Sequence, residues 1–283
     1  MGLLSEMQRT SLDRVEQARE RVPLAALRAA ALAEPPPPPL RLSEHGFDLI
    51  AELKLRSPSL GDLSAETLDP VRRLEAYAEG GAAVVSVLTE PTRFDGDLEH
   101  LKLATDTLQR YGVPVMRKDF VVDPYQLLEA RAWGASGALL IVELLSRGQL
   151  EEMLDCASEH GLFVLLEAFD AEDLELAREL AAQRVGREEQ VLMGLNCRDL
   201  QSLRIDPGRF LALRSQLPPE WLPVAESGVQ SPQQAASVSR LGYRLALVGT
   251  GLMQSHDPEP VSYTHLRAHE TIHAIAYAVF CLK

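Results

Sequence analysis

Charged side chains stand at the ends of several short apolar runs in this sequence. Five charged residues and one amide occupy such positions: Glu52, Lys54, Lys118, Glu167, Asn196 and Glu226. Side chains alternate along a strand, so Glu52 and Lys54 point to the same side. One charge at a strand end is usually a solvated loop residue. Several charges at the ends of independent runs indicate that these ends meet at one rim. Burying such charges together without partners would cost free energy. With Arg198 nearby, the cations nearly balance the glutamates, which is typical of an active site built from paired acids and bases.

The runs that carry these residues number eight, and each is short and rich in Val, Ile and Leu. They cover residues 47–53, 82–88, 113–116, 138–142, 162–166, 191–195, 222–225 and 245–248. Amphipathic segments lie between them, for example after Ser146 and after Asp170. Alternation of this kind predicts parallel strands buried on both faces, with right-handed helical crossovers. No GxGxxG follows the first run, which disfavours an open doubly wound sheet. We therefore predict an α/β fold, a (β/α)8 TIM barrel.

Glycine and hydroxyl residues follow three of the eight runs. They are Ser57 and Gly61 after the first, Ser227 and Gly228 after the seventh, and Gly249 and Thr250 after the eighth. Each glycine alone is more typical of a turn. Loops after the last two strands of such barrels, however, commonly bind phosphate through backbone N–H groups. Together the positions predict a phosphorylated small-molecule substrate.

The segment before the barrel is predicted to be a helical extension. Residues 1–34 carry apolar side chains at helical spacing, and five prolines at 35–39 end the helix and form a stiff spacer. We therefore expect an extension over residues 1–46 and the barrel over residues 47–260.

Composition limits the possible partners and compartment. The chain has 283 residues and a formal net charge of −13, which argues against broad binding to nucleic acid or anionic membranes. No apolar run is long enough to span a membrane, and residues 1–21 lack the apolar core of an export signal. The three cysteines, at 156, 197 and 281, form no CxxC pair. We expect a cytoplasmic protein.

The motifs resemble those of the indole-3-glycerol-phosphate synthase family, a lyase family of tryptophan biosynthesis. The resemblance spans most of residues 47–253, and all eight runs match in order. It is carried by residues 50–54 with 57–59, 86–90 with Phe94, 117–120 with 123–126, 166–167, 194–196 with 198–200, 225–228 and 247–249. The family converts 1-(2-carboxyphenylamino)-1-deoxyribulose 5-phosphate to indole-3-glycerol phosphate, with loss of CO2 and water. The resemblance implies that neither a metal ion nor an organic cofactor is used, and that the N-terminal extension lies over the barrel mouth.

The resemblance also implies a role for each catalytic residue. Lys118 is the general acid for ring closure, for which a pKa lowered by burial or by neighbouring cations would be favourable. Glu167 is the base of the later dehydration. Lys54 binds the substrate carboxylate or acts as a second acid. Glu52 and Glu226 hold the lysines and stabilise positive charge on the substrate nitrogen.

The remaining implied site residues bind substrate. Asn196 contacts sugar hydroxyls or orients Glu167, Phe94 packs on the anthranilate ring, and Arg198 attracts the anion. The expected phosphate ligands are Ser57, Ser227, Gly228, Gly249 and Thr250. Cys197 stands where the family often has asparagine, and we expect it to be a buried thiol. We expect a monomer, with other tryptophan-pathway enzymes as possible partners.

Two other functions are compatible with a barrel of this kind. One is another phosphate-binding barrel enzyme, such as phosphoribosylanthranilate isomerase, which needs an acid/base pair but not this set of two lysines and three glutamates. The other is a catalytically inactive scaffold, which the presence of both Lys118 and Glu167 disfavours.

The last residues differ in character from the barrel. Residues 269–273 match the HExxH zinc-protease motif, but no catalytic domain or further ligand accompanies them. Residues 261–283 instead resemble a translated sequencing adapter. We therefore expect them to be a non-native tail, the natural sequence to end near Pro260 and the eighth helix to be truncated.

Overall fold

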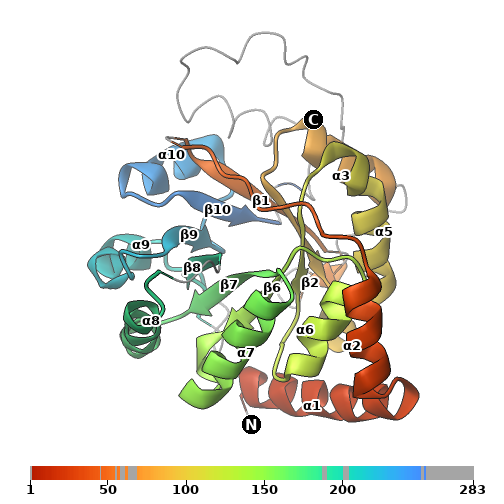
Figure 1. Cartoon of the computed structure of the whole chain (residues 1–283). Coiled ribbons are helices and arrows are strands. Elements are labelled where there is room, and N and C mark those ends of the chain that lie inside the picture. The colour runs from red at the N-terminus through yellow and green to blue at the C-terminus, as the bar shows by residue number, and fades with distance from the viewer. Residues whose placement is uncertain are drawn as a thin grey trace.

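A closed barrel of eight parallel strands forms the centre of the protein (Figure 1). The computed structural model describes residues 2–44, 46–54, 56–57, 61–62, 69–186, 190–199, 204–249 and 252. Hydrogen bonding closes the strands in the order β1-β10-β9-β8-β7-β6-β5-β4. They are β1 (Asp48–Leu53), β4 (Val84–Leu88), β5 (Val115–Lys118), β6 (Gly137–Ile141), β7 (Phe163–Ala168), β8 (Val191–Asn196), β9 (Leu222–Glu226) and β10 (Leu245–Val248). The predicted fold class and all eight strands are confirmed.

Helices connect successive strands along the outside of the barrel (Figure 1). They are α3 (Pro70–Glu79), α4 (Pro91–Phe94), α5 (Leu98–Leu108), α6 (Pro124–Ala132), α7 (Arg147–Glu159), α8 (Ala171–Gln183), α9 (Gly208–Ala212) and α10 (Pro232–Arg240). Short 3-10 turns follow at Gln109–Tyr111, Val142–Leu144 and Arg214–Gln216. Most of these helices begin at an Asp or Ser whose side chain accepts backbone N–H groups of the first turn, as Ser146 does in a capping box.

Strand residues are buried on both faces, which explains their continuous apolar character. Leu165 and Leu139, for example, are almost inaccessible to solvent. One face of each strand fills the barrel interior, and the other packs against the helices. Most of the polar residues of these strands lie near their carboxyl ends, so the sequence itself marks the end of the barrel where chemistry is possible.

The N-terminal extension consists of two helices rather than one. Helices α1 (Leu3–Arg21) and α2 (Leu24–Ala33) are separated at Val22 and Pro23. The prediction of a single helix over residues 1–34 is wrong because a proline disfavours helical backbone at the residue before it, and Val22 is extended. The proline run does end α2, and the guanidinium of Arg131 donates to the carbonyls of Glu34 and Pro35.

Both N-terminal helices pack on the β5–β6 side of the barrel. Helix α2 contacts α6, and α1 contacts the turns that follow β5 and β6 (Figure 1). Gln8 of α1 donates to the carbonyl of Leu144, beyond the end of β6. Helix α1 therefore lies at the carboxyl-end side of the barrel, whereas α2 lies against the outer helix α6.

The last part of the chain lies largely outside the described residues. After β10 these include only Gly249 and Leu252, so neither the truncated eighth helix nor the expected tail at 261–283 falls within them. Two short strands, β2 (Arg56–Ser57) and β3 (Gly61–Asp62), pair antiparallel after β1. Over the described ranges, no helix is both long and apolar enough to cross a membrane.

Candidate active site

Strand β1 brings an acid and a base together at the barrel mouth. Glu52 is 4% exposed, and its Oε1 lies 2.8 Å from Nζ of Lys54. The two residues are two positions apart and therefore on the same side, as the sequence predicts. This ion pair is mostly shielded from solvent, which strengthens the interaction between the charges.

A second acid–base pair joins two strands that are not neighbours. Nζ of Lys118, at the end of β5, lies 3.6 Å from Oε2 of Glu167 in β7. The amide of Asn196, in β8, donates to the other oxygen of Glu167 over 2.9 Å. The amide oxygen of Asn196 accepts the backbone N–H of Arg198, also at 2.9 Å. Asn196 is therefore oriented by one hydrogen bond and orients Glu167 through another.

Glu226, the last residue of β9, completes the group of carboxylates. It pairs in register with Asn196 and is only 1% exposed. A side chain at Gly194 would overlap Oε1 of Glu226, so this glycine leaves the space that the carboxyl group occupies. Among the described residues, none forms a hydrogen bond with Oε1 of Glu226.

Burial and neighbouring charges shift the pKa values of two of these carboxyl groups in opposite directions. Burial raises the pKa of Glu226 well above its usual value, and the nearby carboxylate of Glu167 raises it further, although Lys118 opposes the shift. Burial also acts to raise the pKa of Glu52, but Lys54 and Lys118 outweigh it and lower the pKa below the ordinary value. Glu226 therefore holds a proton more tightly than an ordinary glutamate, and Glu52 holds one less tightly.

The pKa of Lys118 is shifted in the opposite direction to the one expected of a general acid. Burial lowers it, but the carboxylates of Glu167, Glu52 and Glu226 raise it more, and the net value lies above the usual range. The expectation of a lowered pKa considered burial and cations, whereas three carboxylates face this ammonium. In this site Lys118 holds its proton firmly.

The turn after β9 has the conformation of a constrained loop. Ser227 has a positive φ of 66°, which is uncommon for a residue other than glycine and often found at functional sites. A Cβ at Gly228 would lie 2.6 Å from Sγ of Cys197 and from the ring of Phe210. Cys197 is fully buried, as predicted, and burial raises the pKa of its thiol to about 11.

Gly249 lies beside the acid–base pair of β1. A Cβ at this position would overlap Oε1 of Glu52 and lie 3.0 Å from Nζ of Lys54. Gly249 was predicted from its position in a phosphate loop. Its contacts supply a second reason for glycine, because a side chain here would displace the Glu52–Lys54 ion pair.

The structure describes some of the other predicted substrate-binding residues fully and others only in part. Phe94, at the end of α4, lies with its ring centroid 6.3 Å from that of Phe120, which follows β5. Arg198 follows β8 and lowers the pKa of Glu52, so its charge acts across the mouth. For Ser57 only the backbone, in β2, is described, and Thr250 lies outside the described residues.

The arrangement provides two cation–carboxylate pairs and one carboxyl group with a raised pKa, within a single mouth. Such a set can donate a proton at one position and accept one at another. In the part of the chain that is described, no three His, Cys, Asp or Glu side chains are grouped so as to hold a metal ion.

Some residues around the site were not given a role from the sequence. Gly194 makes room for Glu226, and Phe120 is the aromatic neighbour of Phe94. Arg117 and Asp119 flank Lys118 and are both buried. The available signal was the pair of charges on either side of Lys118, at the end of an otherwise apolar strand.

Sequence comparison places the chain among known proteins. A family model described as indole-3-glycerol phosphate synthase matches residues 4–262. The relative from Mycobacterium leprae (strain Br4923) is 40% identical over 239 residues, covering 84% of each chain. The relative from Nocardioides sp. (strain ATCC BAA-499 / JS614) is 43% identical over 241 residues, covering 83% of this chain and 87% of the relative. Both relatives carry the name indole-3-glycerol phosphate synthase.

Solved structures with a similar fold are much more distant in sequence. Orotidine 5'-phosphate decarboxylase from Pyrococcus horikoshii OT3 has a TM-score of 0.55 at 10% identity, over 82% of this chain and 97% of that chain. Phosphoribosyl anthranilate isomerase from Thermotoga maritima has a TM-score of 0.50 at 12% identity, over 82% and 98%. These similarities concern the fold alone, whereas the family match spans most of the sequence together with the site described above. The chain therefore belongs to the indole-3-glycerol phosphate synthase family.

Proposed function

We propose that the protein converts 1-(2-carboxyphenylamino)-1-deoxyribulose 5-phosphate to indole-3-glycerol phosphate, CO2 and water. In the first step a bond forms between the carboxyl-bearing ring carbon and the sugar carbonyl carbon, and the carbonyl oxygen takes a proton. The bond to the carboxylate then breaks, CO2 leaves, and its electron pair restores the aromatic ring. Finally the new hydroxyl group leaves as water with a second proton, and the adjacent carbon loses a proton to form the pyrrole double bond.

The observation that carries this proposal is the convergence of the Lys118–Glu167 and Glu52–Lys54 pairs at one barrel mouth, in a chain of this family. Lys118 donates the proton of ring closure. Its firmly held proton ensures that the acid form is present, and the oxygen becomes basic enough to accept it as the carbonyl is attacked. Glu167 removes the proton from carbon in the dehydration step, oriented by Asn196.

The remaining groups bind the two anionic ends of the substrate and the nitrogen between them. Lys54 binds the carboxylate or protonates the leaving hydroxyl group, and Glu52 balances its charge. Glu226 stabilises positive charge on the nitrogen. Phe94 packs on the aromatic ring and Arg198 attracts the anion. Phosphate is bound by the backbone and hydroxyl groups of Ser57, Ser227, Gly228, Gly249 and Thr250.

We also propose that the enzyme works in the cytoplasm as a monomer. The two described cysteines, Cys156 and Cys197, are both free thiols, which suits a reducing compartment. The isomerase alternative has no comparable support, since it shares only the fold.

Replacement of Lys118 by alanine tests the assignment of the acid. We expect Lys118→Ala to lower kcat by at least about 100-fold, since a positioned general acid contributes 10²–10⁴-fold. The measurement is the appearance of indole fluorescence from the carboxyphenylamino substrate.

Lys102 provides the matched control for this experiment. It lies on the outer helix α5, paired with Asp106 and 42% exposed. Lys102→Ala should keep kcat within about twofold, as surface substitutions away from a site usually do. A Lys118→Ala enzyme with the parent rate would show that another group is the acid. A parent protein that makes no indole product from this substrate would refute the proposed function.

A further inference from the structure

The two neighbours of Lys118 form a buried charged network on the outer side of β5. Side chains alternate along the strand, so Lys118 faces the mouth while Arg117 and Asp119 face the surrounding helices. The Arg117 side chain is 2% exposed and that of Asp119 is fully buried. Helix α1 covers this side through Arg14.

Asp119 accepts five hydrogen bonds from four different residues. Its Oδ1 accepts from the backbone N–H of Phe120 at 2.8 Å and from Nη2 of Arg14 at 2.7 Å. Its Oδ2 accepts from Oγ1 of Thr89 at 2.8 Å, Nη2 of Arg117 at 3.0 Å and Nη1 of Arg14 at 3.0 Å. The carboxylate therefore joins α1, the end of β4 and the end of β5.

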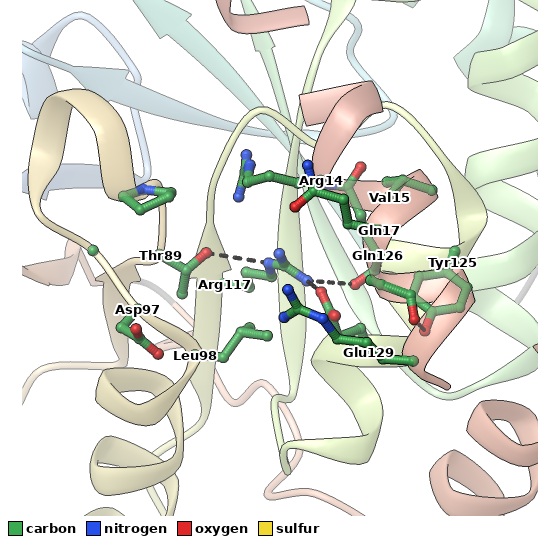
Figure 2. Close-up of a pocket in the computed structure, with 14 residues that line it drawn as sticks. Arg14, Val15, Gln17, Thr89, Asp97, Leu98, Arg117, Tyr125, Gln126 and Glu129 are labelled. Atoms are coloured by element: carbon green, nitrogen blue, oxygen red, sulfur yellow. Dashed lines mark hydrogen bonds and ion pairs between the residues drawn. The ribbon is translucent and has the colours of Figure 1, made fainter. Parts of the chain in front are cut away.

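Arg117 extends the same network to α6. Figure 2 shows its guanidinium between Thr89 and Gln126, and Nη1 donates to the carbonyl of Gln126 at 2.9 Å and to Glu129 at 2.7 Å. Its Nε donates to the hydroxyl oxygen of Thr89 at 3.2 Å. The backbone N–H of Thr89 in turn donates to the carbonyl of Lys118 at 3.0 Å. The residues before and after Lys118 are thus fixed by hydrogen bonds of their side chains, and the carbonyl of Lys118 itself accepts a hydrogen bond.

Helix α1 also holds the turn that follows Lys118. The hydroxyl group of Ser11 donates to the carbonyl of Phe120 at 2.5 Å. The side chain of Gln126 accepts the N–H of Val122 at 2.8 Å and donates to Ser11 at 3.0 Å. The same turn presents the Phe120 ring to Phe94, so both the acid and the aromatic wall depend on it.

A buried ionic network of this kind is a poor source of stability, because the desolvation of its charges offsets their attraction. It can nevertheless fix one geometry, since every donor and acceptor has a defined direction. We propose that Arg14 and Asp119 are positioning residues, which hold Lys118 and the Phe120 turn in place and make the N-terminal helix part of the catalytic apparatus. The expected effect on kcat rests on the proposed function. The expected effect on the order of the Phe120 turn does not depend on it.

A cavity of about 260 Å³ opens beside the network and gives access to it. Arg14, Thr89, Arg117 and Glu129 are among the residues that line it (Figure 2). A small cation could therefore reach the place of the Arg14 guanidinium if that side chain were removed. This allows chemical rescue, a readout that general destabilisation of the fold would not produce.

The test compares Arg14→Ala with Arg19→Ala in the whole chain. Arg19 lies on the same helix and contacts the same connection, at Asp123, but its side chain is 47% exposed and lies outside the network. We expect Arg14→Ala to lower kcat by about 10- to 100-fold, as small misplacements of catalytic groups do, with a much smaller change in KM. Arg19→Ala should stay within about twofold of the parent.

Guanidinium chloride at about 20 mM should restore a measurable part of kcat in Arg14→Ala only, because a guanidinium ion can make the bidentate contact with the Asp119 carboxylate. Arg14→Lys should fall between the parent and Arg14→Ala. Equal kcat values for the Arg14 and Arg19 variants, or a loss in Arg14→Ala that guanidinium does not reverse, would overturn the proposal.

Hydrogen exchange tests the inference without any turnover. In Arg14→Ala the backbone N–H groups of residues 119–122 should exchange faster than in the parent and in Arg19→Ala, and guanidinium should slow them again. Unchanged exchange in this segment would overturn the positioning role. A parent protein that shows the expected exchange pattern but no activity would refute the proposed function alone.

Discussion

At the scale of single residues, two glycines determine where the mouth carboxylates can lie. Gly194 and Gly249 each occupy a position where a methyl group would overlap a carboxylate oxygen, of Glu226 in one case and of Glu52 in the other. Both carboxylates are buried, so they have little room to move aside. The charge distribution of the site thus depends on residues that have no functional group.

Gly194→Ala is therefore expected to impair catalysis. The added methyl group should push the Glu226 carboxylate out of its place beside Glu167, and kcat should fall by about 10-fold or more. The measurement is steady-state kinetics with the proposed substrate, accompanied by thermal unfolding.

Gly148→Ala is the matched control, because Gly148 lies in α7 and a methyl group there would meet nothing within 4 Å. It should leave kcat unchanged and raise the free energy of unfolding by about 0.5–1 kcal/mol. Full activity in Gly194→Ala would show that the Glu226 carboxyl group can lie elsewhere.

The sequence predicts the mouth residues better than the residues that support them. Glu167 and Lys118 could be placed because an apolar strand shows where it ends, and the fold brings all strand ends together. The contact between Arg14 and Asp119 spans 105 positions and depends on how α1 packs, which no local pattern encodes. The raised pKa of Lys118 was likewise missed, because its sign depends on three carboxylates contributed by other strands.

At the scale of elements, the first turn of α8 carries a buried acid with a raised pKa. Asp173 is 8% exposed and accepts the backbone N–H of Phe169 at 2.7 Å. Burial raises its pKa from 3.8 to about 6, and the neighbouring carboxylates of Asp170 and Glu143 contribute, although two backbone N–H groups oppose the change. Because the folded-state value is the higher one, the folded protein binds this proton more tightly than the unfolded chain does.

Asp173 should therefore make stability depend on pH. Its contribution to the free energy of unfolding is fully present below about pH 4 and is lost as the pH rises through about 6, because the folded protein keeps this proton to a higher pH than the unfolded chain does. Each tenfold difference in proton affinity between the two states corresponds to about 1.4 kcal/mol. Asp173→Asn cannot ionise and does not lose this contribution. The free energy of unfolding of the variant, relative to that of the parent, should therefore increase as the pH rises from about 4 to about 8. Urea unfolding at these two pH values measures the difference. Glu172→Gln, exposed in the same turn, is the control and should show no such gain.

Helix boundaries were predicted correctly where a capping residue was present. They were predicted wrongly where a break or a short helix was not recognised. Ser146 and Asp170 begin α7 and α8 as predicted. Pro23, in contrast, divides the extension within a stretch whose apolar spacing continues through it. After Pro207, α9 covers only Gly208–Ala212 before a 3-10 turn. The apolar spacing of this segment would suit a longer helix, because apolar periodicity does not distinguish α from 3-10 geometry over one turn.

At the scale of the whole molecule, an acidic protein surrounds a mouth that can attract an anion. The formal net charge is −13, yet the described mouth carries three cations, Lys54, Lys118 and Arg198, against three glutamates. The mouth is therefore close to neutral, although the protein as a whole is strongly acidic. This arrangement suits a substrate with a carboxylate at one end and a phosphate at the other.

Barrel closure sets a requirement on the segment after β10. Strands β10 and β1 pair directly, and their outer faces need an apolar cover as those of the other strands do. In the other units of the barrel, that cover comes from the helix that follows each strand. We propose, from the resemblance of residues 261–283 to a translated adapter, that this segment did not evolve to supply the cover.

Replacement of residues 261–283 by the C-terminal segment of the Mycobacterium leprae relative should then stabilise the barrel. A gain of about 2 kcal/mol in the free energy of unfolding would raise the Tm by about 4–8 °C in a domain of this size. The measurements are Tm and soluble yield for the parent, the chimera and a control that ends at Pro260. The control should not exceed the parent, because deletion removes residues without covering the β10–β1 face. If parent and chimera unfold at the same temperature, residues 261–283 already provide the cover and the proposal that they are foreign to the barrel is wrong.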